Sequence, residues 1–274
     1  MTRTILITGC SSGIGLDAAR TMKARGWRVL ASVRTEADAA RLAREDGLET
    51  IYLELGDPAS VAAFAQEALA RAGGRIDAIF NNAAYGQPGA VEDLTPDVLR
   101  RQLEVNVIGA HDLTRRIIPS MRKHGAGRIV QCSSVLGLVV SPWRGAYCAS
   151  KFALEALSTS LRYELEGSGI HVSLIEPGPI HSRFVEHAVE ALKANMDLEA
   201  SPHRERYRAR LEGMKAGGQS AFKLPPSAVS KRLIHAVESV RPRRRYYVTT
   251  PTYFAALFLR ILPPVAIDYL AKKF

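Results

Sequence analysis

Residues Thr4-Ile5-Leu6-Ile7-Thr8-Gly9-Cys10-Ser11-Ser12-Gly13-Ile14-Gly15 decide the fold of this chain. The apolar run at 4–8 is typical of a strand buried on both faces, and an amphipathic helical pattern follows the glycines. Glycines let the backbone approach a diphosphate closely, and the start of the helix offers N–H donors. A tight structural turn would also explain them. The flanking strand and helix favour a phosphate-binding turn formed by Gly9, Ser11, Ser12, Gly13, Ile14 and Gly15.

Short apolar runs alternate with longer amphipathic stretches along the rest of the chain. Asp57-Pro58 and Thr95-Pro96 each put a capping residue before a proline, which predicts two helix starts. The alternation indicates an α/β fold, a Rossmann-type, doubly wound parallel sheet of seven strands between two layers of helices, in one domain over 1–274. The predicted strands are Thr4–Thr8, Arg28–Val33, Glu49–Leu53, Ile76–Asn81, Gly127–Cys132, Ile170–Glu176 and Arg245–Thr249.

The composition argues against several classes of protein. An apolar share of 47% in 274 residues can fill a core, which disordered chains cannot do. The longest apolar run, Tyr253–Leu259, is far below the roughly 18 residues of a membrane span. Cys10, Cys132 and Cys148 lack disulfide or zinc spacing and the histidines are scattered, so we expect no metal site and a cytoplasmic location. The net charge of +10 comes without a zinc-finger or RNP-like motif, so we expect no nucleic-acid binding.

The end of the second predicted strand bears on the choice of dinucleotide. Sites that prefer NAD place Asp or Glu there to bind the ribose hydroxyls. Val33 cannot accept such a hydrogen bond, whereas the Arg34 guanidinium can pair with a 2′-phosphate. A solvated loop residue is the alternative for Arg34. We therefore predict NADP(H) as the cofactor.

Four polar features follow at the ends of later elements. They are Asn82-Ala83 after the fourth strand, Asn106 within a helix, Ser133-Ser134 after the fifth strand, and Tyr147 with Lys151 at the start of a helix. With the glycine turn, they make the chain resemble the short-chain dehydrogenase/reductase family in its single-domain form, over roughly residues 4 to 250. The resemblance implies a catalytic tetrad of Asn106, Ser134, Tyr147 and Lys151. Ser134 is preferred over Ser133 because its interval of 13 residues to the tyrosine is the family's usual one.

The tetrad has a chemical rationale of its own. A free tyrosine titrates near pH 10, so it is a poor base at neutral pH. Lys151 lies one helical turn after Tyr147, and its ammonium, like an oxidised nicotinamide, favours the phenolate. Ser134 would hydrogen-bond the substrate oxygen. Asn106 would hold a water molecule that links Lys151 to solvent.

The resemblance implies further cofactor contacts. The segment Pro177-Gly178-Pro179-Ile180-His181-Ser182 is similar to the family's nicotinamide-contacting segment, with Ser182 where a threonine is usual. Ala84 stands where the family commonly has glycine. Glu54 stands where an aspartate usually contacts the adenine, which puts that contact in doubt. The implied cofactor-binding residues beyond the glycine turn are Arg34, Glu54, Leu55, Asn82, Ala83, Tyr147, Lys151, Pro177, Gly178, Ile180 and Ser182.

Two regions depart from the strand–helix rhythm. We expect 181–226 to be a lid over the substrate, although a surface excursion is the plainer alternative. The apolar tail 251–274 is expected to pack on its own domain or a second subunit, and weak peripheral membrane contact is the other reading. The predicted substrate pocket is apolar, with walls from Tyr85, Ser134, Leu136, Leu138, Val139, Phe184 and Phe222.

These observations predict an NADP(H)-dependent carbonyl reductase or alcohol dehydrogenase. The sequences of segments 5–15 and 147–157 look closest to those of the branch with hydroxysteroid and retinol dehydrogenases. This resemblance implies a small apolar alcohol, ketone or aldehyde as substrate. A 3-oxoacyl-thioester reductase and a non-catalytic NADP(H)-binding sensor or scaffold are the alternatives. The resemblance also implies a homodimer or homotetramer built on the helices that carry Asn106 and Tyr147.

Overall fold

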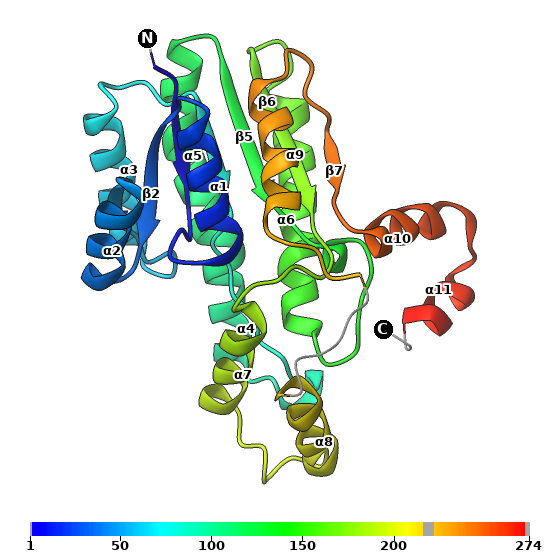
Figure 1. Ribbon diagram of the computed structural model, residues 1–274. Coiled ribbons are helices and arrows are strands. Elements are labelled where there is room, and N and C mark those ends of the chain that lie inside the picture. Colours follow the sequence, from blue (N-terminus) through cyan, green and yellow to red (C-terminus); the bar gives the residue numbers. More distant parts are fainter. Residues whose placement is uncertain (1, 216–221, 272–274) are drawn as a thin grey trace.

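A seven-stranded parallel sheet forms the centre of the computed structural model, which describes residues 2–215 and 222–271 (Figure 1). Its strand order is β3-β2-β1-β4-β5-β6-β7, so the chain reverses direction across the sheet between β1 and β4. All seven predicted strands are present, and their ends differ from the prediction by at most two residues. The strands are β1 Thr4–Ile7, β2 Arg28–Val33, β3 Glu49–Tyr52, β4 Ala78–Asn81, β5 Gly127–Cys132, β6 Ile170–Glu176 and β7 Arg245–Tyr247.

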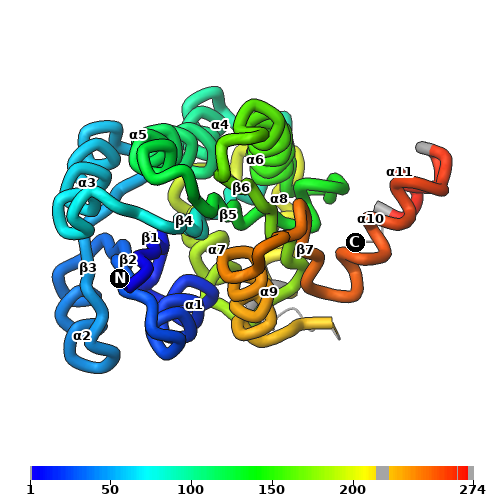
Figure 2. The backbone as a smooth tube through the Cα atoms, turned by 90° about the horizontal axis from the view of Figure 1, so that it is seen from above, coloured from blue at the N-terminus to red at the C-terminus, as the bar shows by residue number. Residues whose placement is uncertain are grey.

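Helices cover both faces of the sheet, as Figure 2 shows from above. One layer contains α1 (Gly13–Ala24), α2 (Glu36–Asp46) and α9 (Ser227–Glu238). The other contains α3 (Pro58–Arg71), α5 (Gly109–Lys123) and α6 (Gly145–Glu164). A separate apolar core fills the space on each side, because the parallel strands carry apolar side chains on both faces. The predicted three-layer architecture is confirmed.

The two predicted helix starts are also observed. Asp57 accepts a hydrogen bond from the Ala59 N–H at 3.0 Å at the start of α3, and Thr95 caps α4 (Pro96–Leu103). The chain continues from α4 through a π-helical turn, η2 (Glu104–Ile108), into α5. Such turns are rare in proteins, and those that occur are often found at functional sites. They change which side chains face the neighbouring elements.

The remaining elements gather beyond the carboxyl ends of the strands. The predicted lid contains α7 (Phe184–Asn195) and α8 (Arg204–Lys215), and the tail forms α10 (Thr250–Ile261) and α11 (Pro264–Ala271), which project beside β7 (Figure 1). Two 3-10 turns, η1 (Val91–Asp93) and η3 (Val135–Gly137), lie in the loops after β4 and β5. Residues 216–221 of the predicted lid and 272–274 of the predicted tail lie outside the described residues. Among the described helices, none is long and apolar enough to cross a membrane.

Candidate active site

A cleft of about 1740 Å³ opens at the carboxyl ends of the strands. It extends from the glycine turn after β1 to the lid and the tail, so one continuous space contacts both the predicted cofactor side and the predicted substrate side. Gly15 and Asn106 lie behind its surface. The predicted site residues that line it are Gly9, Ser11, Ser12, Gly13, Ile14, Arg34, Glu54, Leu55, Asn82, Ala83, Tyr85, Ser134, Leu136, Tyr147, Lys151, Pro177, Gly178, Ile180, Ser182 and Phe184.

The glycine turn is packed too closely for side chains. Gly9 has φ +74°, and a Cβ there would lie 2.9 Å from the Ala83 Cα. A Cβ on Gly15 would lie 2.0 Å from the Gly9 carbonyl oxygen. The Thr8 hydroxyl accepts hydrogen bonds from the N–H groups of Asn82 and Ala83, both at 2.9 Å. The turn therefore presents bare backbone and the start of α1 to the cleft, which fits a diphosphate group.

Arg34 lies at the adenosine side of this turn, at the end of β2. Its side chain is 69% exposed, and its Nη1 is 4.0 Å from Glu54 Oε2. The Glu54 carboxylate also accepts hydrogen bonds from the Gly56 N–H at 3.0 Å and from Arg101 Nη2 at 3.2 Å. Arg101 belongs to α4 and lines the cleft. No local pattern around residue 101 indicates a neighbour 47 residues away, so this contact could not be predicted from the sequence.

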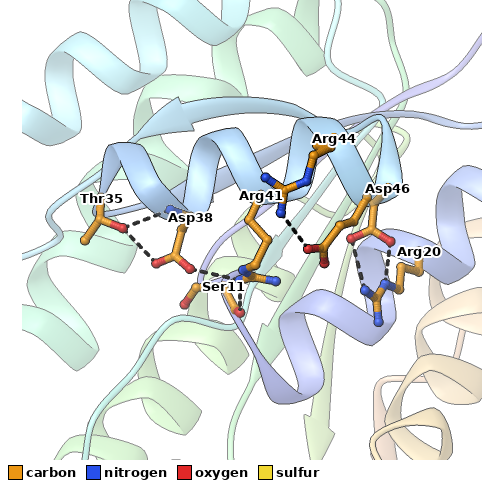
Figure 3. A network of polar contacts seen from close by, with 8 residues as sticks. Ser11, Arg20, Thr35, Asp38, Arg41, Arg44 and Asp46 are labelled. Atoms are coloured by element: carbon orange, nitrogen blue, oxygen red, sulfur yellow. Dashed lines mark hydrogen bonds and ion pairs between the residues drawn. The ribbon is translucent and has the colours of Figure 1, made fainter.

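A second arginine supports the turn from outside, as Figure 3 shows. Arg41 of α2 donates from Nη2 to the Ser11 carbonyl oxygen at 2.7 Å and to Asp38 Oδ1 at 2.9 Å. Thr35 donates from its hydroxyl to Asp38 Oδ2 at 3.0 Å. This network fixes the turn against α2. The sequence analysis missed Arg41 because its charge looks like that of any solvated helix face.

Tyr147, Lys151 and Ser134 meet at the centre of the cleft. Tyr147 and Lys151 lie one turn apart on α6, and the Lys151 Nζ is 5.6 Å from the centre of the Tyr147 ring. Lys151 is buried and donates from Nζ to the Cys132 carbonyl oxygen at 2.8 Å. Ser134 follows β5, and its Oγ accepts a hydrogen bond from the Leu136 N–H at 3.1 Å. The sheet and α6 thus bring together three residues that the sequence places in two segments.

Burial dominates the electrostatics of these groups. It raises the pKa of Tyr147 above its ordinary value, and hydrogen bonding with Ser134 opposes this shift only in part. Burial also lowers the pKa of Lys151, against the attraction of Cys132 and Glu155. The sequence predicts a phenolate favoured by the Lys151 ammonium. In the protein by itself the protonated phenol is favoured instead, because desolvation penalises the charged form more strongly.

Asn106 lies in the π-helical turn and is almost completely buried. Its Oδ1 accepts from the Tyr85 N–H at 3.0 Å, and its Nδ2 donates to the Tyr85 carbonyl oxygen at 2.9 Å and to Ser150 Oγ at 3.1 Å. These bonds join the loop after β4 to α6, one residue before Lys151. Asn106 therefore fixes the wall of the cleft that carries Tyr85, and its predicted role in holding a water stays a prediction.

A buried ionic cluster behind Lys151 escaped the sequence analysis. Glu155 lies one turn after Lys151 on α6, and Glu176 ends β6. The Arg245 Nη1, from β7, is 2.7 Å from Glu155 Oε2 and contacts Glu176 Oε1 as well. Glu176 has no exposed surface. Burial and the nearby Glu155 raise the pKa of Glu176 to about 8, against the attraction of Arg245.

The substrate side of the cleft is mainly apolar. The Phe184 ring of α7 meets Tyr147 edge-on, with 5.4 Å between the ring centres. Phe254 and Phe258 stack on α10, with 5.7 Å between their centres. The lid and the tail therefore both contribute aromatic rings to the same cleft, and that of Phe184 contacts Tyr147 directly. The lining side chains from these elements include Phe184, Val185, Ala188, Leu192, Phe222, Phe254, Phe258, Leu259, Ile267 and Leu270.

Comparisons with known proteins agree with this arrangement. The sequence profile of the family described as short chain dehydrogenase matches residues 3–193. The chain belongs to the short-chain dehydrogenase/reductase family and is an oxidoreductase of that family.

Relatives match over nearly the whole chain. Uncharacterized oxidoreductase YbbO of Escherichia coli K12 is 41% identical over 98% of this chain and 93% of its own length. Human 17-beta-hydroxysteroid dehydrogenase type 1 is 35% identical, over 98% of this chain and 84% of its own. The crystal structure of a short chain dehydrogenase/reductase from Burkholderia phymatum in complex with NAD superposes with a TM-score of 0.80 at 27% identity, covering 99% of this chain and 95% of that one.

Proposed function

We propose that this protein is an NADP(H)-dependent carbonyl reductase, or alcohol dehydrogenase in the reverse direction, that acts on apolar alcohols, ketones or aldehydes. One observation carries the proposal. Tyr147, Lys151 and Ser134 open onto the same cleft as the glycine turn, so a nicotinamide dinucleotide held at the turn could reach the space beside Tyr147. A sensor or scaffold protein would need the turn but not the Tyr–Lys pair.

The residues of this chain divide the work of reduction. The glycine turn and Lys151 would hold the cofactor, which would supply the hydride for the carbonyl carbon when bound. Tyr147 gives its phenolic proton to the carbonyl oxygen, and its raised pKa keeps that proton in place until the oxygen becomes basic. Ser134 donates a hydrogen bond to the same oxygen as negative charge develops there. Lys151 stabilises the phenolate that remains, and the hydroxyl product leaves once Tyr147 is protonated again from solvent.

The proposed preference for NADP(H) rests on the end of β2. Val33 is nearly buried and offers no acceptor to a ribose hydroxyl, while Arg34 is exposed at the rim of the cleft. A 2′-phosphate would compete with Glu54 for Arg34, at a separation of 4.0 Å that leaves the arginine free to turn. The phosphate carries more charge than the carboxylate, which favours this exchange.

We also propose that the lid and the tail form the walls of the substrate pocket. α10 contributes five residues to the cleft lining and α11 two, which supports packing of the tail at the pocket over a membrane role. The basic segment 241–244 precedes β7 and α10 follows it, so this segment and the apolar helices lie at opposite ends of that strand, and Arg260 is the one basic residue among the described residues of α10 and α11 (Figure 1). An interfacial anchor would place them together. Co-sedimentation with anionic liposomes that is lost on truncation after Thr250 would contradict this proposal.

The homodimer or homotetramer expected from the family stays a proposal. Exposed apolar side chains on η2 and α6 support it, since Ile108, Phe152 and Leu157 are each more than 40% exposed. Sedimentation equilibrium of the wild type and of Phe152→Glu tests it. A dimer or larger assembly that the charged variant dissociates is the expected result, and a monomeric wild type would contradict it.

The function is tested by oxidation of NADPH and of NADH against a panel of steroid ketones, retinals, aliphatic aldehydes and acetoacetyl thioesters. Turnover of an apolar ketone or aldehyde with NADPH is expected. Reduction of thioesters alone would favour the 3-oxoacyl-thioester alternative. Tight NADPH binding without turnover of any carbonyl compound would favour the sensor.

A further inference from the structure

Two arginines of the cleft lie close to Trp143: Arg144 follows it directly in sequence, and the Arg210 guanidinium carbon is 4.9 Å from the centre of its ring. Arg144 immediately precedes α6, and Arg210 lies on α8 of the lid, and both line the cleft. Partial burial, and after it the charge of Arg144, lowers the pKa of Arg210, in agreement with the position of both arginines beside Trp143. The charge of Arg144 also acts on Tyr147, one helical turn away. Arg144 therefore lies near the reacting centre, and Arg210 lines the same cleft.

No carboxylate balances this pair within the described part of the chain. Glu54, Glu186 and Glu190 also line the cleft, but no ion pair joins any of them to Arg144 or Arg210. α6 has no acidic residue in its first turn, so the positive end of its dipole adds to the same potential. An uncompensated cluster of like charges beside an apolar space is unfavourable unless a ligand supplies the opposite charge.

Two other arginines of α8 are paired with carboxylates. Arg208 turns to Glu199 and Glu205, at 2.7 and 3.1 Å. Arg204 contacts Glu205 at 3.3 Å. Arg210 instead lies over the Trp143 ring, with its guanidinium carbon 4.9 Å from the ring centre.

Trp143 holds Arg210 in this position. Its φ of +68° is the only left-handed conformation of a non-glycine residue among the described residues, and such backbone strain is commonly kept at functional sites. The indole also meets the buried Tyr207 edge-on at 5.2 Å. The Tyr207 hydroxyl accepts from the Ala90 N–H and donates to Asp93 Oδ2, both at 2.8 Å, which anchors α8.

We propose that Arg144 and Arg210 form a subsite for an anionic group, a carboxylate or a phosphate, at the far end of an apolar carbonyl substrate. The proposal rests on the proposed function and names its substrate class. The apolar walls hold the hydrocarbon part, Tyr147 and Ser134 receive the carbonyl, and the two guanidinium groups bind the anion. Planar guanidinium groups suit both carboxylate and phosphate oxygens.

Calorimetric titration without cofactor tests the subsite independently of turnover. The ligands are octanoate, octyl phosphate and 1-octanol, and the proteins are the wild type, Arg144→Met, Arg210→Met and the matched control Arg208→Met. We expect at least one anion to bind the wild type roughly tenfold or more tighter than the alcohol, as one charge-assisted hydrogen bond would give. Arg144→Met and Arg210→Met should remove most of this preference, and Arg208→Met should keep it. The anion that binds tighter identifies a carboxylate or a phosphate as the natural group.

Equal affinity of the wild type for the three ligands would overturn the subsite. So would a loss of the anion preference in Arg208→Met as large as that in Arg144→Met and Arg210→Met. The matched kinetic comparison is NADPH-dependent reduction of octanal and of 8-oxooctanoate. KM for the charged aldehyde should rise about tenfold in Arg210→Met while that for octanal stays unchanged. If neither aldehyde is reduced but anion binding still depends on both arginines, the proposed reaction fails and the subsite stands.

Discussion

The two ends of the cleft are built in different ways. At the cofactor end, backbone lies against backbone, and a methyl group on Gly15 would come within 2.0 Å of the Gly9 carbonyl oxygen. At the substrate end, helices of the lid and the tail contribute side chains that stay partly exposed, such as Phe254 at 51%. The first end depends on a fixed backbone shape. The second depends on the side chains that helices distant in sequence bring together. Substitutions of these side chains can therefore change the substrate specificity without changing the fold.

The largest expected effect is at the centre, where the two ends meet. Tyr147→Phe should keep NADPH binding and lose about three orders of magnitude in kcat, because a positioned proton donor is removed. Tyr163→Phe, on the exposed part of the same helix, is the control and should be unchanged. Steady-state kinetics on a verified substrate measure both. A Tyr147→Phe rate near that of the wild type would refute the acid–base role.

The next effect compares a glycine from each end. Gly15→Ala should destabilise the protein by roughly 3 kcal/mol and weaken cofactor binding, because the Gly9 backbone must move. Gly213→Ala on α8 meets nothing within 4 Å and should stabilise by about 0.5 kcal/mol or more through helix propensity. Urea unfolding gives both values. Similar changes in the free energy of unfolding for the two variants would show that the glycine turn is no more rigid than α8.

Stability against pH tests the buried cluster that joins β6 to α6. The folded state keeps the Glu176 proton up to about pH 8, whereas the unfolded carboxyl loses it above its ordinary pKa of about 4.5. The Glu176 contribution is therefore fully present below pH 4.5 and is lost as pH rises towards 8. From pH 5 to 8, the unfolding free energy of the wild type should fall by roughly 3 kcal/mol relative to Glu176→Gln, which follows from the difference between the two pKa values, and the folded value already includes the attraction of Arg245. The exposed control Glu166→Gln should follow the wild type, and parallel curves for all three proteins would contradict the assigned pKa.

The smallest effect concerns cofactor choice. Arg34→Ala should weaken the binding of NADPH by about 1.5 kcal/mol and leave the binding of NADH unchanged. This value is at the low end for a charge-assisted hydrogen bond because the Arg34 side chain is largely exposed. Arg44→Ala, whose side chain pairs with Glu45 outside the cleft, is the control. Fluorescence titration of both cofactors measures the difference. Equal affinity of the wild type for NADH and NADPH would show that β2 does not select the cofactor.

The sequence by itself determined the sheet, the glycine turn and the spacing of the Tyr–Lys pair. Most of the strands are short, largely apolar runs, and Asp57 and Thr95 cap helices through bonds to residues two or three positions away. The pair Tyr147 and Lys151 lies on one helical face because of its spacing alone. Such features depend on neighbours in sequence, so a local pattern is enough to predict them.

Only the tertiary structure decided the rest of the site. Arg101 reaches Glu54 across 47 residues, and Arg245 joins Glu176 across 69. Arg210 lies over Trp143, the residue next to Arg144, because α8 is anchored by the Tyr207 hydroxyl at a loop 117 residues earlier in the chain. No periodicity encodes these pairs. They follow from which helices pack beyond the same strand ends, and that packing is settled by burial of apolar surface over the whole chain rather than by any single segment.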